Sequence, residues 1–275
     1  MTVFPWILYL SSSLLKTVTY GGNLILNSAS SCVCRTQRCL TEEPLEVECD
    51  SCGLDPICQV LDYAEPGSGV PEGVLLRRLP VARGETLFQA NGVFSSIFAV
   101  KSGSFKTYIP STGKGDRVIG FHQPGELIGV EAVSSGSYPC TARALEPSSV
   151  CELWISRLPE AGRPNEVVQQ ALIQLLGSEV AFSHIVATAL IQQNGEQRLA
   201  AFLLNISHRR SERGLPESEF CLQMSRGDIA NYLGLASETV SRLLTRFQNQ
   251  GLIALRRKQV LLRDHAGLML IIEPN

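Results

Sequence analysis

The segment from Ser225 to Phe247 constrains the local fold more tightly than any other stretch of the chain. Ser225 and Asp228 form the S-x-x-D pattern of a capping box, which starts a helix at Arg226. Gly234 then ends that helix in a tight turn, because glycine adopts the left-handed backbone conformation without strain. A second helix follows, with an apolar face made of Val240, Leu243, Leu244 and Phe247. Two short helices joined by a glycine turn are the pattern of a helix-turn-helix.

The opposite face of the second predicted helix carries Glu238, Ser241 and Arg242. Arg pairs with guanine, Glu accepts from cytosine and Ser does either, so we expect these three side chains to contact base edges. The plainer alternative is an amphipathic helical hairpin with solvated charges.

Two apolar runs, 252–255 and 260–262, flank a basic turn and predict a hairpin of the winged-helix type. Basic residues outnumber acidic ones seven to two between residues 225 and 263, although the whole chain has a net charge of −2. Such a local excess is the footprint of a DNA-binding segment. The expected phosphate contacts are Arg226, Arg246, Arg256, Arg257 and Lys258.

Short apolar runs punctuated by glycines extend from residue 73 to about residue 158. Turn residues at such close spacing predict an antiparallel β-roll or barrel. From about 164 to 193 the pattern changes to a long helix that is apolar on most sides, and such a helix must be buried on most sides. We expect it to form a homodimer, rather than to be a single core helix, through a stripe of Ile173, Leu176, Val180, Ala187 and Leu190.

Cys49, Cys52 and Cys58 have C-x2-C-x5-C spacing, which lets one short loop point three sulfurs at one centre. Thiolate sites for iron–sulfur clusters or zinc are built in this way, and the spacing alone leaves both open. The chain has nine cysteines in all. An odd number beside a predicted DNA-binding segment favours a reducing cytoplasm over a disulfide scaffold.

Residues 1–48 are expected to be an N-terminal extension. Its first 34 residues carry one charge, Lys16, and an apolar run from Val3 to Leu15. The run is shorter than the roughly 20 residues that a membrane-spanning helix needs, and a basic signal-peptide start is missing. We therefore expect a translated upstream stretch or a dispensable tail, with a membrane or export role as the alternative.

The chain resembles the Fnr (fumarate and nitrate reduction regulator) branch of the Crp/Fnr superfamily. The likeness covers roughly residues 49–263, and Glu238, Ser241 and Arg242 match the base-reading positions of that branch. It also rests on the three-cysteine loop and on segments 84–88, 125–129, 198–202 and 226–235.

The resemblance implies a [4Fe–4S] cluster held by the loop cysteines and by Cys151, which lies in the matching Val-Cys-Glu context. Cys140 and a non-cysteine ligand are alternatives for the fourth position. The additional cysteines Cys32, Cys34 and Cys39 are expected not to be ligands. The alternatives are competition with the loop cysteines and a position upstream of the true start of the protein.

The resemblance further implies a cytoplasmic transcription regulator that binds a two-fold symmetric DNA site as a homodimer in the absence of oxygen. Oxygen would convert the cluster and release the dimer. Contact with RNA polymerase is expected, and binding to a membrane is not.

Two other functional classes fit the sequence less well. Cyclic-nucleotide-binding relatives clamp the phosphate with an Arg-Ser pair, whereas segment 136–141 contains no Arg, so no cyclic nucleotide is expected. An enzyme needs a constellation of acid, base or nucleophile, and the four histidines are scattered without ligand spacing. We therefore expect no catalytic residues.

The expected fold is α+β, with four parts along the chain. Residues 1–48 form the extension, and 49–160 form the cysteine loop and a β-roll of the cyclic-nucleotide-binding type. Residues 161–195 form the dimerisation helix, and 196–275 form the winged helix-turn-helix domain.

Overall fold

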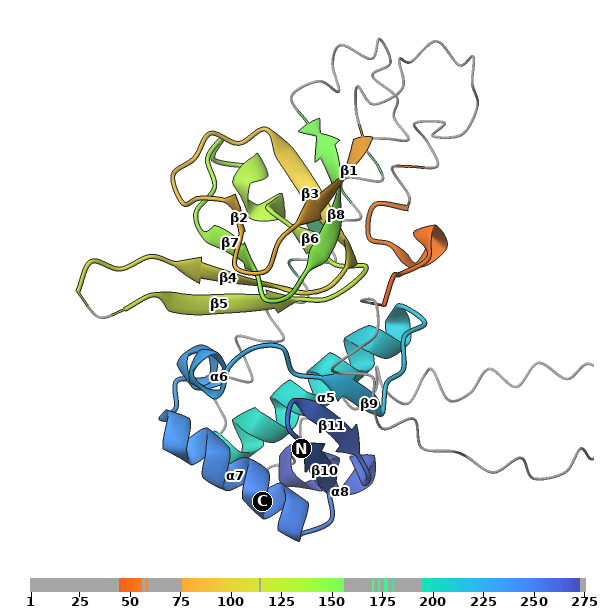
Figure 1. Cartoon of the computed structure of the whole chain (residues 1–275), viewed down its shortest axis with the longest axis vertical. Coiled ribbons are helices and arrows are strands. Elements are labelled where there is room, and N and C mark those ends of the chain that lie inside the picture. Colours follow the sequence, from red (N-terminus) through yellow and green to blue (C-terminus); the bar gives the residue numbers. More distant parts are fainter. Residues whose placement is uncertain are drawn as a thin grey trace, which may run out of the picture. The chain divides into compact units, whose positions relative to one another are not determined.

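The computed structural model describes residues 45–55, 58, 76–113, 115–155 and 194–272, together with positions 170, 173, 176, 177 and 180. Antiparallel strands dominate the described residues up to 155, and helices dominate those from 194 onward (Figure 1). The expected α+β class is therefore confirmed. Most of the predicted extension, including Cys32, Cys34 and Cys39, lies outside the described residues.

Two four-stranded antiparallel sheets form the β-roll. The first has the order β1-β8-β3-β6, with bounds Leu76–Val81, Ser148–Trp154, Ser96–Ser102 and Leu127–Ile128. The second has the order β2-β7-β4-β5, with bounds Thr86–Phe88, Thr141–Ala144, Phe105–Ile109 and Arg117–His122. Two 3-10 turns accompany them, η2 at Cys49–Ser51 and η3 at Val130–Val133. The predicted roll is confirmed.

Large apolar side chains fill the interior of the roll. Phe105, Ile128 and Val150 are almost completely buried there. Gly103 makes the turn between β3 and β4 with φ at 81°, and a Cβ atom at this position would collide with Ser148. This turn therefore requires glycine.

The C-terminal part is a winged helix-turn-helix. Its helices are α5 (Gly195–Glu212), α6 (Arg226–Leu233), α7 (Ser237–Asn249) and α8 (His265–Ile272). Its small sheet has the order β10-β11-β9, with bounds Ile253–Arg256, Gln259–Leu262 and Glu219–Cys221. The helix-turn-helix and the hairpin are confirmed, whereas α8 has no counterpart in the sequence-based expectation. No described helix combines the length and the apolar character needed to cross a membrane.

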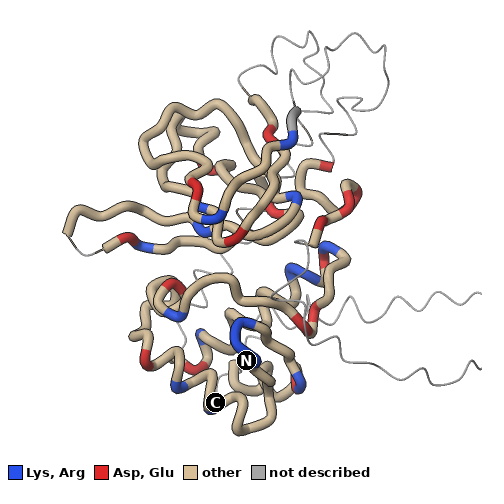
Figure 2. Tube along the Cα trace, in the orientation of Figure 1, with Lys and Arg blue, Asp and Glu red and all other residues tan. Residues whose placement is uncertain are grey.

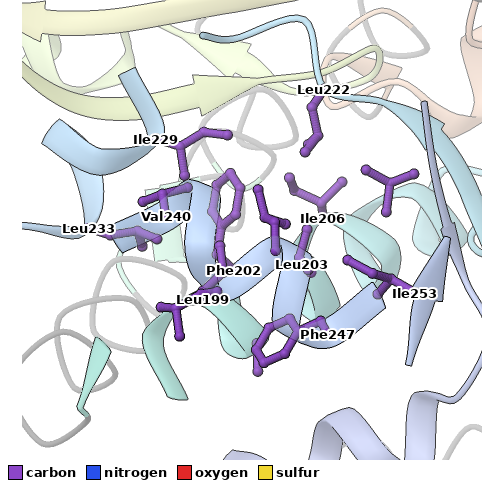
Figure 3. Packing of buried hydrophobic residues seen from close by; sticks show 14 of the residues in the cluster. Leu199, Phe202, Leu203, Ile206, Leu222, Ile229, Leu233, Val240, Phe247 and Ile253 are labelled. Carbon is purple, nitrogen blue, oxygen red and sulfur yellow. The ribbon is translucent and has the colours of Figure 1, made fainter. Parts of the chain in front are cut away.

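One apolar core holds the helices of this domain together. Figure 3 shows side chains from α5, α6 and α7 pointing toward one another, among them Phe202, Ile229 and Phe247. Asn194 caps α5 through a full capping box with Gln197, which fixes where this central helix begins. The core buries the inner face of α7 and leaves its outer face free.

The long helix predicted at 164–193 is described only in part. Positions 170, 173, 176, 177 and 180 are helical. Ala187 and Leu190 of the predicted dimer stripe lie outside the described residues.

Candidate functional site

Helix α7 carries the predicted base-reading residues on a free face. Glu238, Ser241 and Arg242 are all exposed, while the opposite face of α7 is buried in the domain core. The hydroxyl of Ser241 donates a hydrogen bond to the carbonyl oxygen of Ser237 at 3.0 Å. Glu238 and Arg242 lie one helical turn apart and therefore project side by side. The surface can present one carboxylate and one guanidinium to adjacent base pairs.

Helix α6 and the turn after it hold α7 in place. The hydroxyl of Ser225 accepts from the backbone N–H of Asp228 at 3.0 Å, and the backbone N–H of Ser225 donates back to the Asp228 carboxylate at 3.2 Å. Gly234 ends α6 with φ at 65°, the left-handed conformation expected for the turn. Both features follow from the sequence alone.

The predicted phosphate contacts differ in how exposed and how paired they are. Arg256, Arg257 and Lys258 are exposed at the turn between β10 and β11, and Figure 2 shows this turn as basic. Arg246 on α7 is also exposed, but its guanidinium forms an ion pair with Glu196 at 3.0 Å. Arg226 is half-buried, and burial lowers its pKa. The turn between β10 and β11 and the outer face of α7 therefore both present exposed basic side chains, although Lys258 also donates to the carbonyl oxygen of Gln223 at 3.1 Å.

The cysteine loop is anchored to the roll through backbone contacts. The backbone N–H of Val47 donates to the carbonyl oxygen of Lys101 at 3.0 Å, and that of Gly53 donates to Gly125 at 2.8 Å. Leu54 is completely buried. A Cβ atom on Gly53 would lie only 2.9 Å from Cγ of Leu127, so the loop lies directly against the roll.

The structure places three of the predicted cysteine ligands against one apolar cluster, and Cys49 is near enough to affect their charge. Cys52 and Cys58 pack against the same apolar cluster as Cys151 of β8, a cluster that contains Leu54 and Leu127. Burial raises the pKa of Cys58 to about 12, and the nearby thiols of Cys52, Cys151 and Cys49 raise it further. Burial likewise raises the pKa of Cys151, with added contributions from Cys52 and Cys49. The four side chains therefore share one electrostatic environment.

Basic side chains surround these thiols. Nζ of Lys101 donates to the sulfur of Cys49 at 3.7 Å and to the carbonyl oxygen of Val47. Arg213, which follows α5, donates from Nη1 to the carbonyl oxygen of Ser51 at 3.3 Å. Burial raises the pKa of Cys52, while the charges of Arg213 and Lys101 act against this rise. Such cations stabilise thiolates, the form that binds metal.

Lys101 and Arg213 were not among the site residues expected from the sequence. Each lies far from the loop along the chain, and neither has a spacing that relates it to the cysteines.

Within the described part of the chain, no three His, Cys, Asp or Glu side chains converge closely enough to hold a single metal ion.

Cys140 occupies a different environment. It is completely buried inside the roll, and its thiol donates to Oε1 of Glu131 at 3.1 Å. Burial raises its pKa, and the Glu131 carboxylate adds to the effect. It belongs to the apolar cluster around Phe105, whereas Cys151 belongs to the cluster beneath the cysteine loop.

Of the predicted dimer stripe, the structure describes two exposed side chains and one that packs against the cysteine site. Ile173 is 68% exposed and Val180 is 55% exposed. Leu176 instead packs against the apolar cluster that carries Cys52, Cys58 and Cys151. The helix therefore has one side toward the cysteine site and uncovered apolar side chains elsewhere.

In segment 136–141, which has no Arg to bind a phosphate, the side chain of Tyr138 packs into the interior of the roll. Tyr138 is buried, stacks on Phe88 with ring centroids 3.8 Å apart and donates to the carbonyl oxygen of Ser96 at 2.7 Å. His122 is half-buried, and the loss of contact with water lowers its pKa to about 4.

The roll and the C-terminal helical domain each match a known protein domain. Residues 197–271 match the Crp-like helix-turn-helix domain, and residues 78–158 match the cyclic nucleotide-binding domain. The chain is 38% identical over 223 residues to the transcriptional activator protein FnrA of Stutzerimonas stutzeri, covering 81% of this chain and 91% of that protein. It is 35% identical over 222 residues to the fumarate and nitrate reduction regulatory protein of Escherichia coli K12, covering 81% and 89%.

Solved structures show the same fold. FixK2 from Bradyrhizobium japonicum superposes with a TM-score of 0.65 at 24% identity, covering 74% of this chain and 100% of that chain. A mutant of CooA from Carboxydothermus hydrogenoformans gives a TM-score of 0.58 at 19% identity, covering 78% and 94%.

Proposed function

The chain belongs to the Crp/Fnr family of transcription regulators, and from this premise we propose that it is an oxygen-responsive regulator carrying a [4Fe–4S] cluster. In this proposal the cluster-loaded homodimer binds a two-fold symmetric DNA site, and oxygen abolishes that binding. The protein works in the cytoplasm and contacts RNA polymerase. The regulators that it is similar to are named for transcription activation and for fumarate and nitrate reduction.

The cysteine site carries this proposal. Cys52, Cys58 and Cys151 are half-buried and Cys49 is exposed beside them. They supply four soft donors, and Fe–S clusters take four cysteine thiolates. Lys101 and Arg213 supply positive charge beside these donors. The donor set therefore fits the cluster, which when bound supplies an oxygen-sensitive centre.

Two contacts connect the cysteine site to the predicted dimer helix and to the DNA-binding domain. Leu176 of the predicted dimer helix packs against the cluster of side chains beneath the cysteines. Arg213, at the end of α5, donates to the loop at Ser51. A rearrangement of the loop would therefore act both on the dimer helix and on the first helix of the DNA-binding domain. Switching needs the two states to differ in dimer or DNA affinity by several kcal/mol.

The roll is not expected to bind a cyclic nucleotide. Segment 136–141 has no Arg to pair with a phosphate. Tyr138 turns its ring and hydroxyl into the buried interior, where both have partners.

The decisive experiment measures absorbance, iron and sulfide on anaerobically purified protein, before and after exposure to air, with DNA binding followed in parallel. The proposal expects a broad visible band, about four iron and four sulfide per chain, and loss of DNA binding as the band bleaches. A colourless protein that holds zinc and binds DNA equally in air would contradict the oxygen-sensing proposal and leave the DNA-binding regulator intact.

A further inference from the structure

The side chain of Asn231 closes an open strand edge of the roll. β5 is an outer strand of its sheet. Oδ1 of Asn231 accepts from the backbone N–H of Val118 at 2.8 Å, and Nδ2 donates to the carbonyl oxygen of Asp116 at 2.8 Å. One amide thus satisfies a donor and an acceptor that a neighbouring strand would otherwise pair with. Asn231 belongs to α6, so this bond ties the helix-turn-helix to the roll.

A second polar contact lies on the neighbouring strand. Nζ of Lys106 on β4 pairs with Oδ1 of Asp228 on α6 at 2.6 Å, and both side chains are only about one-fifth exposed, at 20% and 18%. The other carboxylate oxygen of Asp228 accepts from the hydroxyl of Ser225 at 2.7 Å. A single carboxylate therefore caps α6 and binds it to the roll. Burial on its own raises the pKa of Asp228, but the hydrogen bonds from Lys106 and Ser225 outweigh it and lower that pKa.

An aromatic cluster supports these polar contacts. Phe121 of β5 lies edge-on to Tyr232 of α6, with ring centroids 5.3 Å apart, and 6.0 Å from Phe202 of α5. Tyr108 and Val118 of the roll belong to the same apolar core as the helices of the DNA-binding domain. The contact between the β4–β5 hairpin and α6 is therefore both polar and apolar.

The contact leaves the DNA-reading face free. Asp228 and Asn231 lie on α6, whereas Glu238, Ser241 and Arg242 are exposed on α7. A protein in this arrangement can still place α7 in a major groove. The contact is thus suited to orienting the reading helix rather than to blocking it.

We propose that Lys106 and Asn231 form an orienting latch, which holds α6 on the β4–β5 hairpin so that each subunit presents α7 at a defined angle. The latch comprises Lys106, Asp116, Val118, Asp228 and Asn231. Both side chains are positioning residues for DNA binding, since they act through α6 and touch no base. When two reading helices must dock on one duplex, a fixed angle raises the effective concentration of the second.

The test compares two duplexes of equal length in anaerobically prepared full-chain protein. The half-site sequence is first selected from a pool of random duplexes with the unaltered protein. One duplex carries two half-sites in two-fold symmetric arrangement, and the other carries one half-site and a scrambled second. The variants are Lys106→Met and Asn231→Leu, which keep side-chain bulk, together with Lys106→Arg as the conservative rescue. Arg117→Met is the matched control, because Arg117 is exposed on the same hairpin and takes no part in the latch.

Each latch variant is expected to lose at least about five-fold in affinity for the full site and less than about two-fold for the half-site. Lys106→Arg and Arg117→Met should keep the ratio of the two affinities. Hydrogen exchange at the Val118 amide should also be faster in Asn231→Leu than in the unaltered protein, because its acceptor is gone.

Three results would overturn the latch. They are an unchanged or stronger affinity for the full site, an equal loss on both duplexes, and a Val118 amide that exchanges freely in the unaltered protein. This readout rests on the homodimer proposed above. If the unaltered protein itself shows no preference for the full site, the homodimer fails and the latch as stated fails with it. A preference that persists in the variants contradicts the latch alone.

Discussion

The guanidinium groups of Arg242 and Arg246 occupy one helix but stand in different electrostatic surroundings. Arg242 is exposed on the reading face, whereas Arg246 is already paired with Glu196 of α5. An exposed pair of this kind contributes little to stability, so Arg246 remains available for a phosphate. Arg242 has the reach to form two hydrogen bonds with one guanine.

Replacing Arg242 by Ala should therefore cost about 1–3 kcal/mol of DNA-binding free energy and relax the preference at a single base pair. The measurement is binding to duplexes that differ one base pair at a time. Arg246→Ala is the companion variant, and it should weaken binding to all sequences alike and reduce the salt slope by about 1. Uniform weakening by Arg242→Ala would make that residue a phosphate contact instead.

The two roll cysteines allow an equally direct comparison. Cys151 shares its surroundings with the loop thiols, whereas the thiol of Cys140 donates a hydrogen bond to Glu131 within the roll. Cys151→Ser should therefore abolish cluster loading, whereas Cys140→Ser should keep about four iron per chain. Iron and sulfide counts on anaerobic protein decide between them. If Cys151→Ser still holds about four iron per chain, the fourth ligand must be another residue.

At the scale of elements, the cysteine loop depends on how closely it approaches the β5–β6 turn. Gly53 donates to Gly125, and Gly125 in turn donates to the carbonyl oxygen of Val100 at 2.7 Å. A Cβ atom on Gly53 would lie 3.0 Å from the oxygen of Gly125 and closer still to Leu127. Any added side chain must push the loop away from the roll.

Gly53→Ala is accordingly expected to lower cluster loading and to cost about 1–3 kcal/mol of stability through overpacking. Iron content and urea unfolding of the anaerobic protein measure the two effects. Gly113→Ala serves as the control, since a Cβ atom there meets nothing within 4 Å. Normal loading in Gly53→Ala would show that the loop is not held by this approach.

For the molecule as a whole, exposed apolar side chains on the partly described helix favour the association of two chains. Ile173 and Val180 are exposed although both are large and apolar. A second copy of the helix would remove this surface from water, at roughly 25 cal/mol per Å² of apolar area. The homodimer is therefore the arrangement that we expect in the DNA-binding form.

Ile173→Asp should convert the dimer to a monomer and weaken binding to a two-fold symmetric DNA site. Light scattering of the anaerobic protein measures the mass. The control is Val93→Asp, because Val93 is an 85% exposed apolar residue on the roll, outside the predicted stripe. A dimer that survives Ile173→Asp, or an unaltered protein that is monomeric both with and without the cluster, would contradict the proposed interface.

Local sequence determined much of the DNA-binding domain. The capping box of Ser225 and Asp228, the turn at Gly234 and the apolar face of α7 each depend on residues within a few positions of one another. Their geometry follows from short-range hydrogen bonds and helical periodicity, so a single sequence is enough to predict them. The spacing of Cys49, Cys52 and Cys58 is local in the same sense.

Tertiary structure decided what depends on pairing between distant parts of the chain. It placed Cys151 beside the loop, which no spacing in the chain predicts and only the family resemblance had implied. It likewise brought Lys101 and Arg213 to the same place. It also joined Asn231 to the edge of β5, more than a hundred residues earlier in the chain. Such contacts have no periodicity and no fixed spacing. They arise only because the two sheets close into a roll and its β4–β5 hairpin packs against the apolar core of the helices, so the folded backbone determines which polar side chains meet.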